Sequence, residues 1–496
     1  MIVGGLDVGT TGCKIALYDE KATLVDTYYY EYQTVHESGR HEINFIDVRN
    51  GVLSLLKNAV SKYHVDALGV TSFGETFAML DENDNILTPS MLYTDPRGKE
   101  QCEYLEETVG KDKLIEITGV APNPMYSISK CMWQKENRPD EFSKTRHILL
   151  GEDFVVYTLT GNAVIDYSLA ARTAAFNIKS KCYSKEILSA AGIDESLLSK
   201  PVETGSIAGK TLSEINEYLG IDYDITVVCG CHDQIAGIIG SGVFESGFAM
   251  DGTGTVECIP VVLKDVPNDT NLYSCGYSVV PYIDGKYACY ALSFTGGATL
   301  KWFRDNFSEL EKQQADNENK NVYAMLDSRV SKNPTEILIL PHFAGAATPY
   351  MDTDSKAAMV GITLETTKFD IYKALMEGTS YEMLLNFNTL KEFTGDVKEI
   401  RATGGGATSD VWLQIKADIL NAKIVSLDCK EVGAAGTAAI TGKAIGIYDD
   451  LKETVKKMVP TRKEFIPNTL NTEKYKELFN KYKDLYSSVK KLGKGE

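Results

Sequence analysis

The fold is decided by the stretch Ile2-Val3-Gly4-Gly5-Leu6-Asp7-Val8-Gly9-Thr10-Thr11-Gly12-Cys13-Lys14-Ile15-Ala16-Leu17-Tyr18 at the amino end of the chain. Two apolar runs with strand-like composition are joined by a short turn, which predicts a β-hairpin. Gly9 and Gly12 can adopt the positive φ angles of a tight turn and bring bare backbone amides against a ligand. The turn is therefore a candidate anion cradle.

Polar side chains around this turn are those that a nucleoside triphosphate requires. Asp7 ends the first strand, where its carboxylate can hold a hydrated Mg²⁺ ion, while Thr10, Thr11 and Lys14 supply hydroxyl donors and a positive charge. The motif differs from the common phosphate loop, which runs from a strand into a helix, because here a second strand follows the turn. For this hairpin alone, an ordinary glycine-rich turn with a structural aspartate is the alternative.

A near copy of the hairpin lies halfway along the chain, at residues 248–263, where Asp251 again separates an apolar run from glycines and threonines. A repeat at nearly half of the 496 residues predicts two related domains, 1–245 and 246–496, that each offer one hairpin to a shared cleft. The length of the chain also favours two domains. Chance similarity between short Gly/Thr runs is the alternative.

Two more glycine clusters follow strand-like segments. At residues 398–420, a strand, the run Gly404-Gly405-Gly406 and a helix capped by Thr408 or Ser409 form a candidate nucleotide contact, because the first amides of a helix point outward. The pair Gly296-Gly297 also precedes a helix and is interpreted as a packing turn.

Composition narrows the function classes. The chain has 51 basic and 69 acidic residues, a net charge of −18, and 43% hydrophobic residues, which suits a globular enzyme and argues against a nucleic-acid partner. No run approaches the roughly 18 apolar residues of a membrane span, and the amino end has no signal-like segment. We therefore expect a cytoplasmic α/β protein with no membrane partner, in which strands alternate with helices.

Carboxylates for a second substrate follow three other apolar segments. Glu75, Asp95 and Asp233 with Gln234 all lie where α/β sheets bind ligands, at the carboxyl ends of strands. Carboxylates accept hydrogen bonds from neighbouring hydroxyls, so a sugar or polyol acceptor fits. A turn with a local ion pair is the alternative for Asp95 and Arg97, and a helix cap is the alternative for Asp233.

These residues resemble the FGGY carbohydrate kinases over nearly the whole chain. That resemblance implies an α/β fold of two duplicated actin-like ATPase domains (ribonuclease H-like) with an interdomain cleft. The motifs that carry it are Asp7-Val8-Gly9-Thr10-Thr11, Thr94-Asp95-Pro96-Arg97, Lys130-Cys131-Met132-Trp133, Leu159-Thr160-Gly161, His232-Asp233-Gln234, Ala357 to Glu377 and Gly404-Gly405-Gly406-Ala407.

The resemblance also implies a role for each candidate residue in an ATP- and Mg²⁺-dependent kinase. Asp233 would be the general base, and the acceptor would contact Glu75, Asp95 and Gln234. Asp7 would serve Mg²⁺. The phosphates would be held by Thr10, Thr11, Lys14, Gly254 and Thr255, and the nucleoside site would be lined by Gly297, Gly405, Gly406 and Ser409.

Departures from the family pattern bear on the acceptor. Where glycerol kinases read Gln-Arg-Glu-Thr, this chain has Phe73-Gly74-Glu75-Thr76, which lacks the arginine. A pentulose is the leading expectation; fuculose, gluconate, glycerol and other polyols are alternatives, as is a non-kinase actin-like ATPase. A dehydrogenase is disfavoured because no strand–Gly-x-Gly-x-x-Gly–helix unit is present. A homodimer is a further expectation.

Overall fold

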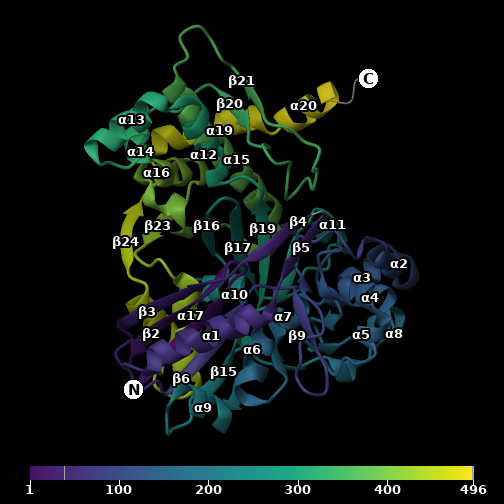
Figure 1. The fold of residues 1–496 in the computed structure, drawn as a ribbon. Helices are drawn as coiled ribbons and strands as arrows, with labels where there is room; N and C mark the ends of the chain where they lie inside the picture. The colour runs from purple at the N-terminus through teal and green to yellow at the C-terminus, as the bar shows by residue number, and fades with distance from the viewer. Residues whose placement is uncertain (38, 494–496) are drawn as a thin grey trace.

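The computed structural model describes residues 1–37 and 39–493 and contains two lobes, each built around its own mixed β-sheet (Figure 1). The first lobe has a six-stranded sheet, in the order β14 (Ile207–Lys210), β15 (Thr226–His232), β6 (Ala67–Ser72), β1 (Ile2–Val8), β2 (Gly12–Asp19) and β3 (Leu24–Glu31). The second lobe has a seven-stranded sheet, in the order β18 (Ser278–Pro281), β19 (Tyr287–Ser293), β17 (Glu257–Leu263), β16 (Phe248–Thr253), β22 (Glu399–Thr403), β23 (Lys423–Leu427) and β24 (Thr461–Phe465).

The two sheets repeat one topology. In the first, β1 pairs antiparallel with β2 and parallel with β6, and β6 pairs parallel with β15. In the second, β16 pairs antiparallel with β17 and parallel with β22, and β22 pairs parallel with β23. Antiparallel strands β14 and β24 then extend the corresponding ends. The predicted duplication, with one hairpin at the same place in each sheet, is confirmed.

Helices and short strands complete each lobe. The first-lobe helices are α1 (Phe45–Val60), α2 (Lys99–Val109), α3 (Lys111–Thr118), α4 (Ser127–Asn137), α5 (Pro139–Phe142), α6 (Gly151–Thr160), α7 (Tyr167–Ala171), α8 (Lys185–Ala191) and α9 (Ser213–Leu219). The second-lobe helices are α11 (Thr270–Ser274), α12 (Gly297–Phe307), α13 (Glu309–Glu318), α14 (Val322–Asp327), α15 (Lys368–Thr394), α16 (Asp410–Leu420), α18 (Leu451–Met458), α19 (Thr469–Tyr482) and α20 (Leu485–Gly493). Within the described residues, none of the helices has the length and apolar character needed to cross a membrane.

Short strands form small sheets outside the two main ones. They are β4 (Thr34–Glu37), β5 (Arg40–Ile43), β8 (Ser90–Met91), β7 (Phe77–Leu80), β9 (His147–Leu150), β10 (Val164–Asp166), β13 (Lys200–Val202), β11 (Phe176–Asn177), β12 (Cys182–Tyr183), β20 (Leu338–Leu340) and β21 (Ala358–Val360). Single 3₁₀ turns lie at Glu195–Leu197, Ile283–Gly285 and Gly405–Thr408.

The first hairpin turn is tight, but for a different reason from the one predicted. The Gly9 N–H donates to the Gly12 carbonyl over 2.9 Å, which closes the turn. Neither Gly9 nor Gly12 has a positive φ angle, so that part of the prediction was wrong. A β-carbon added at Gly12 would lie 2.6 Å from the Tyr30 carbonyl oxygen and 2.6 Å from the Tyr29 hydroxyl. Close packing against β3 therefore explains the glycine at position 12.

Two helices rich in small residues, α10 (Asp233–Gly240) and α17 (Val432–Ala444), pack on each other and join the lobes. Although α17 follows β23 of the second sheet, it packs on β1 and β6 of the first, and Figure 1 shows it among the elements of the first lobe. A β-carbon at Gly5 would lie 1.9 Å from the Ala434 carbonyl oxygen, and one at Gly436 would lie 2.3 Å from that of Ala236. Backbone contact through glycine therefore holds the lobes together.

The predicted domain boundary at residue 245 falls in the connection between α10 and β16. It separates the two sheets, but not the packing units, because α17 of the second half lies on the first sheet. The boundary itself stays a prediction.

The second hairpin differs from the first in its charged residues. Asp251 is 1% exposed, and the Lys416 Nζ atom lies 2.5 Å from its Oδ2 and 2.6 Å from Oε1 of Glu257. The Thr253 hydroxyl completes this cluster, 2.9 Å from Lys416 Nζ. Burial raises the pKa of Glu257 to about 7 in spite of the nearby lysine. Lys416 therefore supplies one positive charge to two carboxylates that are buried beneath the turn.

We expect the stability of the protein to depend on the glycine contact between α10 and α17. Gly436→Ala places a β-carbon against backbone atoms and should lower the free energy of unfolding by about 1–3 kcal/mol. Gly237→Ala, on the facing helix, is the matched control, since its β-carbon would meet only Met250 side-chain atoms, the nearer at 3.5 Å. In this control, the free energy of unfolding should stay unchanged or rise by up to about 1 kcal/mol, because alanine has a higher helix propensity than glycine. Urea unfolding measures the free energy of unfolding of both variants, and an equal loss in the two would contradict the packing argument.

Removing the buried ammonium should be costlier still. Lys416→Met leaves Asp251 and Glu257 buried without their cation, so we expect a loss of about 3–5 kcal/mol in the free energy of unfolding. Lys423→Met removes a partly exposed lysine that pairs with Glu399 and Glu464, and should cost about 1 kcal/mol or less. Denaturant titration compares the two, and a Lys416→Met protein as stable as the Lys423→Met protein would refute the assigned role.

Candidate active site

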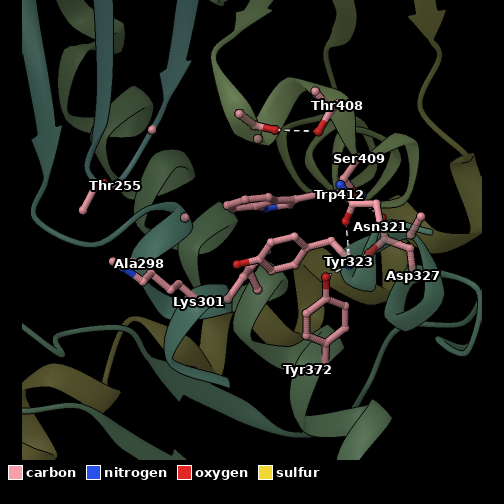
Figure 2. Close-up of a pocket in the computed structure, with 16 residues that line it drawn as sticks. Thr255, Ala298, Lys301, Asn321, Tyr323, Asp327, Tyr372, Thr408, Ser409 and Trp412 are labelled. Atoms are coloured by element: carbon pink, nitrogen blue, oxygen red, sulfur yellow. Dashed lines mark hydrogen bonds between the residues drawn. The ribbon is translucent and has the colours of Figure 1, made fainter. Parts of the chain in front are cut away.

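A pocket of about 370 Å³ lies in the second lobe, and three glycine-containing segments that are distant in sequence border it (Figure 2). Six residues predicted for nucleotide binding line this pocket: Gly254, Thr255, Gly297, Gly405, Gly406 and Ser409. The structure therefore brings together the second hairpin turn, the start of α12 and the loop between β22 and α16.

Close backbone approach at glycines holds these three segments against one another. The Gly297 N–H donates to the Gly254 carbonyl over 2.8 Å. A β-carbon at Gly406 would lie 2.7 Å from Thr253 Cβ, so a larger residue there would push the segments apart. The Ala298 N–H also donates to the Thr255 carbonyl over 3.1 Å. These first amides of α12 therefore fix the hairpin turn, which agrees with the packing role predicted for Gly296-Gly297.

The opposite wall of the pocket is aromatic and acidic. Figure 2 shows the rings of Trp412 and Tyr323 facing the middle of the pocket, with Tyr372 beneath them. Ser409 accepts a hydrogen bond from the Trp412 N–H over 3.1 Å, which caps α16, and donates to Asp327 Oδ2 over 2.7 Å. The Tyr372 hydroxyl donates to Asp327 Oδ1 over 3.0 Å. Burial raises the pKa of Asp327.

Sequence reasoning found the glycine side of this pocket but missed the wall formed by α14. Tyr323 and Asp327 come from a short helix without glycines or a recognisable motif. Only the tertiary fold brings α14 beside Ser409, so no local signal pointed to it.

The first hairpin turn lies outside this pocket, because Thr10, Thr11 and Lys14 are not among its lining residues. Lys14 Nζ lies 2.6 Å from Glu431 Oε2, at the start of α17, and 3.5 Å from Asp7 Oδ2. The Asp7 side chain is 15% exposed. Burial and the charge of Glu431 raise the pKa of Asp7, against the lowering effect of Lys14. Glu431 is a further site candidate that the sequence did not suggest.

Asp233 is the first residue of α10, and its carboxylate does not cap the helix. The N-cap is His232, without a side-chain capping bond. His232 Nε2 lies 3.1 Å from Asp233 Oδ1, and the Asp233 side chain is 33% exposed. Burial, together with the charges of Asp7 and Glu75, raises the pKa of Asp233 to about 7. Gln234 follows as a half-buried residue.

Glu75 is buried and is paired with an arginine that the sequence did not single out. The Arg172 Nε donates to Glu75 Oε1 over 2.5 Å, and the guanidinium lies 5.0 Å from the centre of the Tyr126 ring. Burial raises the pKa of Glu75 against the charge of Arg172. The motif at Phe73–Thr76 lacks an arginine, but the end of α7 supplies one from elsewhere in the chain.

Asp95 lies in the predicted turn, where its carboxylate is already engaged. Its oxygens accept hydrogen bonds from the backbone N–H of His41 and of Arg97 and from the Arg97 guanidinium, at 2.7 to 3.0 Å, and the side chain is 0% exposed. Against the effect of burial, the Arg97 guanidinium holds the pKa of Asp95 below its usual value. The local ion pair is thus observed, while contact with an acceptor stays a prediction.

Comparisons with known proteins agree with this arrangement. Residues 2–240 match the model of the N-terminal domain of the FGGY family of carbohydrate kinases, and residues 254–445 match that of its C-terminal domain. The xylulose kinase of Staphylococcus xylosus is 26% identical over 97% of this chain and 99% of its own. A glycerol kinase of Thermococcus gammatolerans is 28% identical over 97% of this chain and 96% of its own.

A solved structure shows the same fold. The xylulose kinase of Lactobacillus acidophilus, determined with bound ligand, superposes with a TM-score of 0.89 at 23% identity, covering 98% of each chain. Together with the duplicated sheets and the grouped glycine loops, the two family matches show that this chain belongs to the FGGY family of carbohydrate kinases and is an ATP-dependent sugar kinase.

Proposed function

We propose that this enzyme transfers the γ-phosphoryl group of ATP to a hydroxyl of a pentulose, with Asp233 as general base. The observation that carries the proposal is the position of Asp233. Its side chain is 33% exposed at the start of α10, its Oδ1 lies 3.1 Å from Nε2 of His232, and the charge of Glu75 acts on it. A partly exposed carboxylate beside a second polar cluster suits proton acceptance from a bound hydroxyl.

The nucleoside of ATP would occupy the second-lobe pocket. Aromatic faces of Trp412 and Tyr323 suit a purine ring, and the glycines at Gly297 and Gly405-Gly406 leave room for the ribose and the phosphates. The triphosphate would then reach the first lobe, where Thr10, Thr11 and Lys14 supply donors and charge. Both hairpin turns, including Gly254-Thr255, would hold one triphosphate from opposite sides.

Asp7 is the proposed Mg²⁺ ligand. Lys14 is paired with it, and the negative charges of Glu431 and Asp233 act on the same region. Within the described residues, no group of three metal-binding side chains is present. That fits Mg²⁺, which usually takes one or two carboxylates and completes its shell with phosphate and water oxygens. Bound there, the ion would neutralise phosphate charge.

In the proposed reaction, the acceptor hydroxyl attacks the γ-phosphorus, its proton passes to Asp233, and the bond to the bridging oxygen breaks to release ADP. Phosphoryl transfer depends mainly on positioning and charge neutralisation. Lys14 would contribute charge at the phosphates, while Asp233 would orient the hydroxyl and accept its proton. His232, whose pKa is lowered well below its usual value by burial and Arg172, would stay neutral beside the base.

Relatives support a pentulose as the acceptor, because curated matches over nearly the whole chain are xylulose kinases. Glycerol kinases also match, so glycerol and other polyols are the second candidates. The altered motif at Phe73–Thr76 and the arginine supplied by α7 argue against simple transfer of the glycerol site. A cytoplasmic location and a homodimer stay predictions.

Asp233→Asn tests the proposed base. We expect turnover with the preferred sugar to fall about 10²- to 10⁴-fold, because the amide cannot accept the proton. Binding of ATP, measured by calorimetry, should change little, since the nucleoside pocket lies in the other lobe. ADP release is the readout for turnover.

Asp194→Asn is the control for this substitution. Asp194 is an exposed residue of the same lobe that caps a 3₁₀ turn, so its amide variant should keep normal turnover. An Asp233→Asn enzyme with near-normal turnover would show that another group takes the proton.

The pH dependence of the rate should report the same group. Below a pH of about 7, Asp233 is largely protonated and cannot accept a proton, so kcat/KM for the sugar should rise with pH and level off above about 7. Direct quantification of ADP across this range avoids the pH dependence of coupling enzymes. A profile that is flat from about pH 5.5 to 8 would contradict a base with this pKa.

A further inference from the structure

Buried polar atoms without hydrogen-bond partners gather around Asp233. Among the residues that the structure describes, these include Nη1 of Arg172, Nδ1 of His232 and the hydroxyl of Tyr290. Buried donors and acceptors are rarely left unpaired in native proteins, and clusters of them call for a missing partner. Their concentration next to the partly exposed Asp233 indicates the place of a polar ligand.

Arg172 presents one fixed donor to this cluster. Its Nε and Nη2 contact Glu75, and the guanidinium plane lies over Tyr126, so the side chain has little freedom. The side chain is 8% exposed, and the Nη1 group of the guanidinium has no hydrogen-bond partner among the described residues. A planar guanidinium that is already held on one edge is suited to donate from the other.

Tyr290 brings a second donor from the other lobe. It lies on β19, it is 5% exposed, and its ring centre is 6.3 Å from that of His232. Arg172 borders the same histidine, since a β-carbon added at Gly74 would lie 3.1 Å from Arg172 Cγ and 3.1 Å from His232 Nε2. Arg172 and Tyr290 therefore lie near His232, the neighbour of the proposed base, and come from opposite lobes.

The charges in this region determine which oxygen these donors suit. Glu75 balances the guanidinium, and the carboxylate of Asp233 adds a further negative charge. A carboxylate ligand would be repelled by this negative charge. A hydroxyl is a less good match than a carbonyl, because two donors cannot satisfy its own O–H group. A neutral carbonyl oxygen only accepts hydrogen bonds and can accept two, so it suits a pair of donors.

We propose that Arg172 and Tyr290 determine acceptor specificity by donating hydrogen bonds to the carbonyl oxygen of an open-chain ketose. This inference rests on the proposed kinase function and deepens it. It assigns the ketone, rather than the chain of hydroxyls, as the feature that separates a ketose from a polyol or an aldonate at this site.

The test compares kcat/KM for D-xylulose, xylitol and D-xylonate in the wild type and in Arg172→Lys. Lysine keeps a positive charge beside Glu75 but has no group equivalent to the unpaired Nη1 of the guanidinium. We expect the wild type to prefer D-xylulose, and the variant to lower the ratio of kcat/KM for D-xylulose over xylitol about 10- to 100-fold, the usual range for a lost charged hydrogen bond. An equal fall for both acceptors would reduce Arg172 to a structural residue.

Tyr290→Phe gives an independent measurement from the second lobe. It should lower the same ratio about 3- to 10-fold, the range for a neutral hydrogen bond, without lowering the melting temperature, because the hydroxyl has no partner among the described residues. Tyr282→Phe is the matched control, since the Tyr282 hydroxyl donates to the Val243 carbonyl over 2.7 Å. That control should lower the melting temperature and leave the ratio unchanged.

The outcomes separate this inference from the proposed function. If no sugar or polyol stimulates ADP release by the wild type, the kinase proposal fails, and the inference fails with it. If D-xylulose is phosphorylated but both variants keep the wild-type ratio, or if xylitol or D-xylonate is the preferred acceptor, only the carbonyl assignment is overturned.

Discussion

The crossing of α10 and α17 is the contact on which the geometry of the site depends. Each helix begins beside a charged residue of the site, α10 at Asp233 and α17 directly after Glu431, which pairs with Lys14. Glycine at position 436 allows the two backbones to touch, as does glycine at position 5 for α17 and β1. The spacing between the proposed base and the first phosphate turn is thus set by backbone packing rather than by flexible side chains.

Charge is distributed differently in the two lobes. Asp251 of the second hairpin is neutralised in the interior by Lys416, whereas Asp7 of the first remains partly exposed and close to other carboxylates. The duplicated hairpins have therefore diverged: the carboxylate of the second is buried and paired with a buried lysine, and the carboxylate of the first is partly exposed beside Lys14. This asymmetry agrees with a metal ion placed on one side of the triphosphate only.

Local patterns in the sequence predicted the fold well, because both hairpins and the glycine turns leave short-range signatures. The reason given for Gly12 was wrong, since its packing against β3 is a tertiary contact. Residues such as Arg172, Asp327 and Glu431 were missed for the same reason: each lies in an ordinary helical or loop segment and becomes part of a site only through distant partners. Asp95 shows a mixed case, a motif residue that accepts hydrogen bonds from the neighbouring Arg97 and from the distant His41.

The account depends most on the claim that one triphosphate extends between the two hairpin turns and ends next to Asp233. A crystal structure of the enzyme with Mg²⁺, a non-hydrolysable ATP analogue and a ketose tests it directly. The account predicts that the terminal phosphate lies between the turns of β1–β2 and β16–β17, with a sugar hydroxyl hydrogen-bonded to the Asp233 carboxylate. A terminal phosphate bound away from Asp233, with no sugar between them, would contradict it.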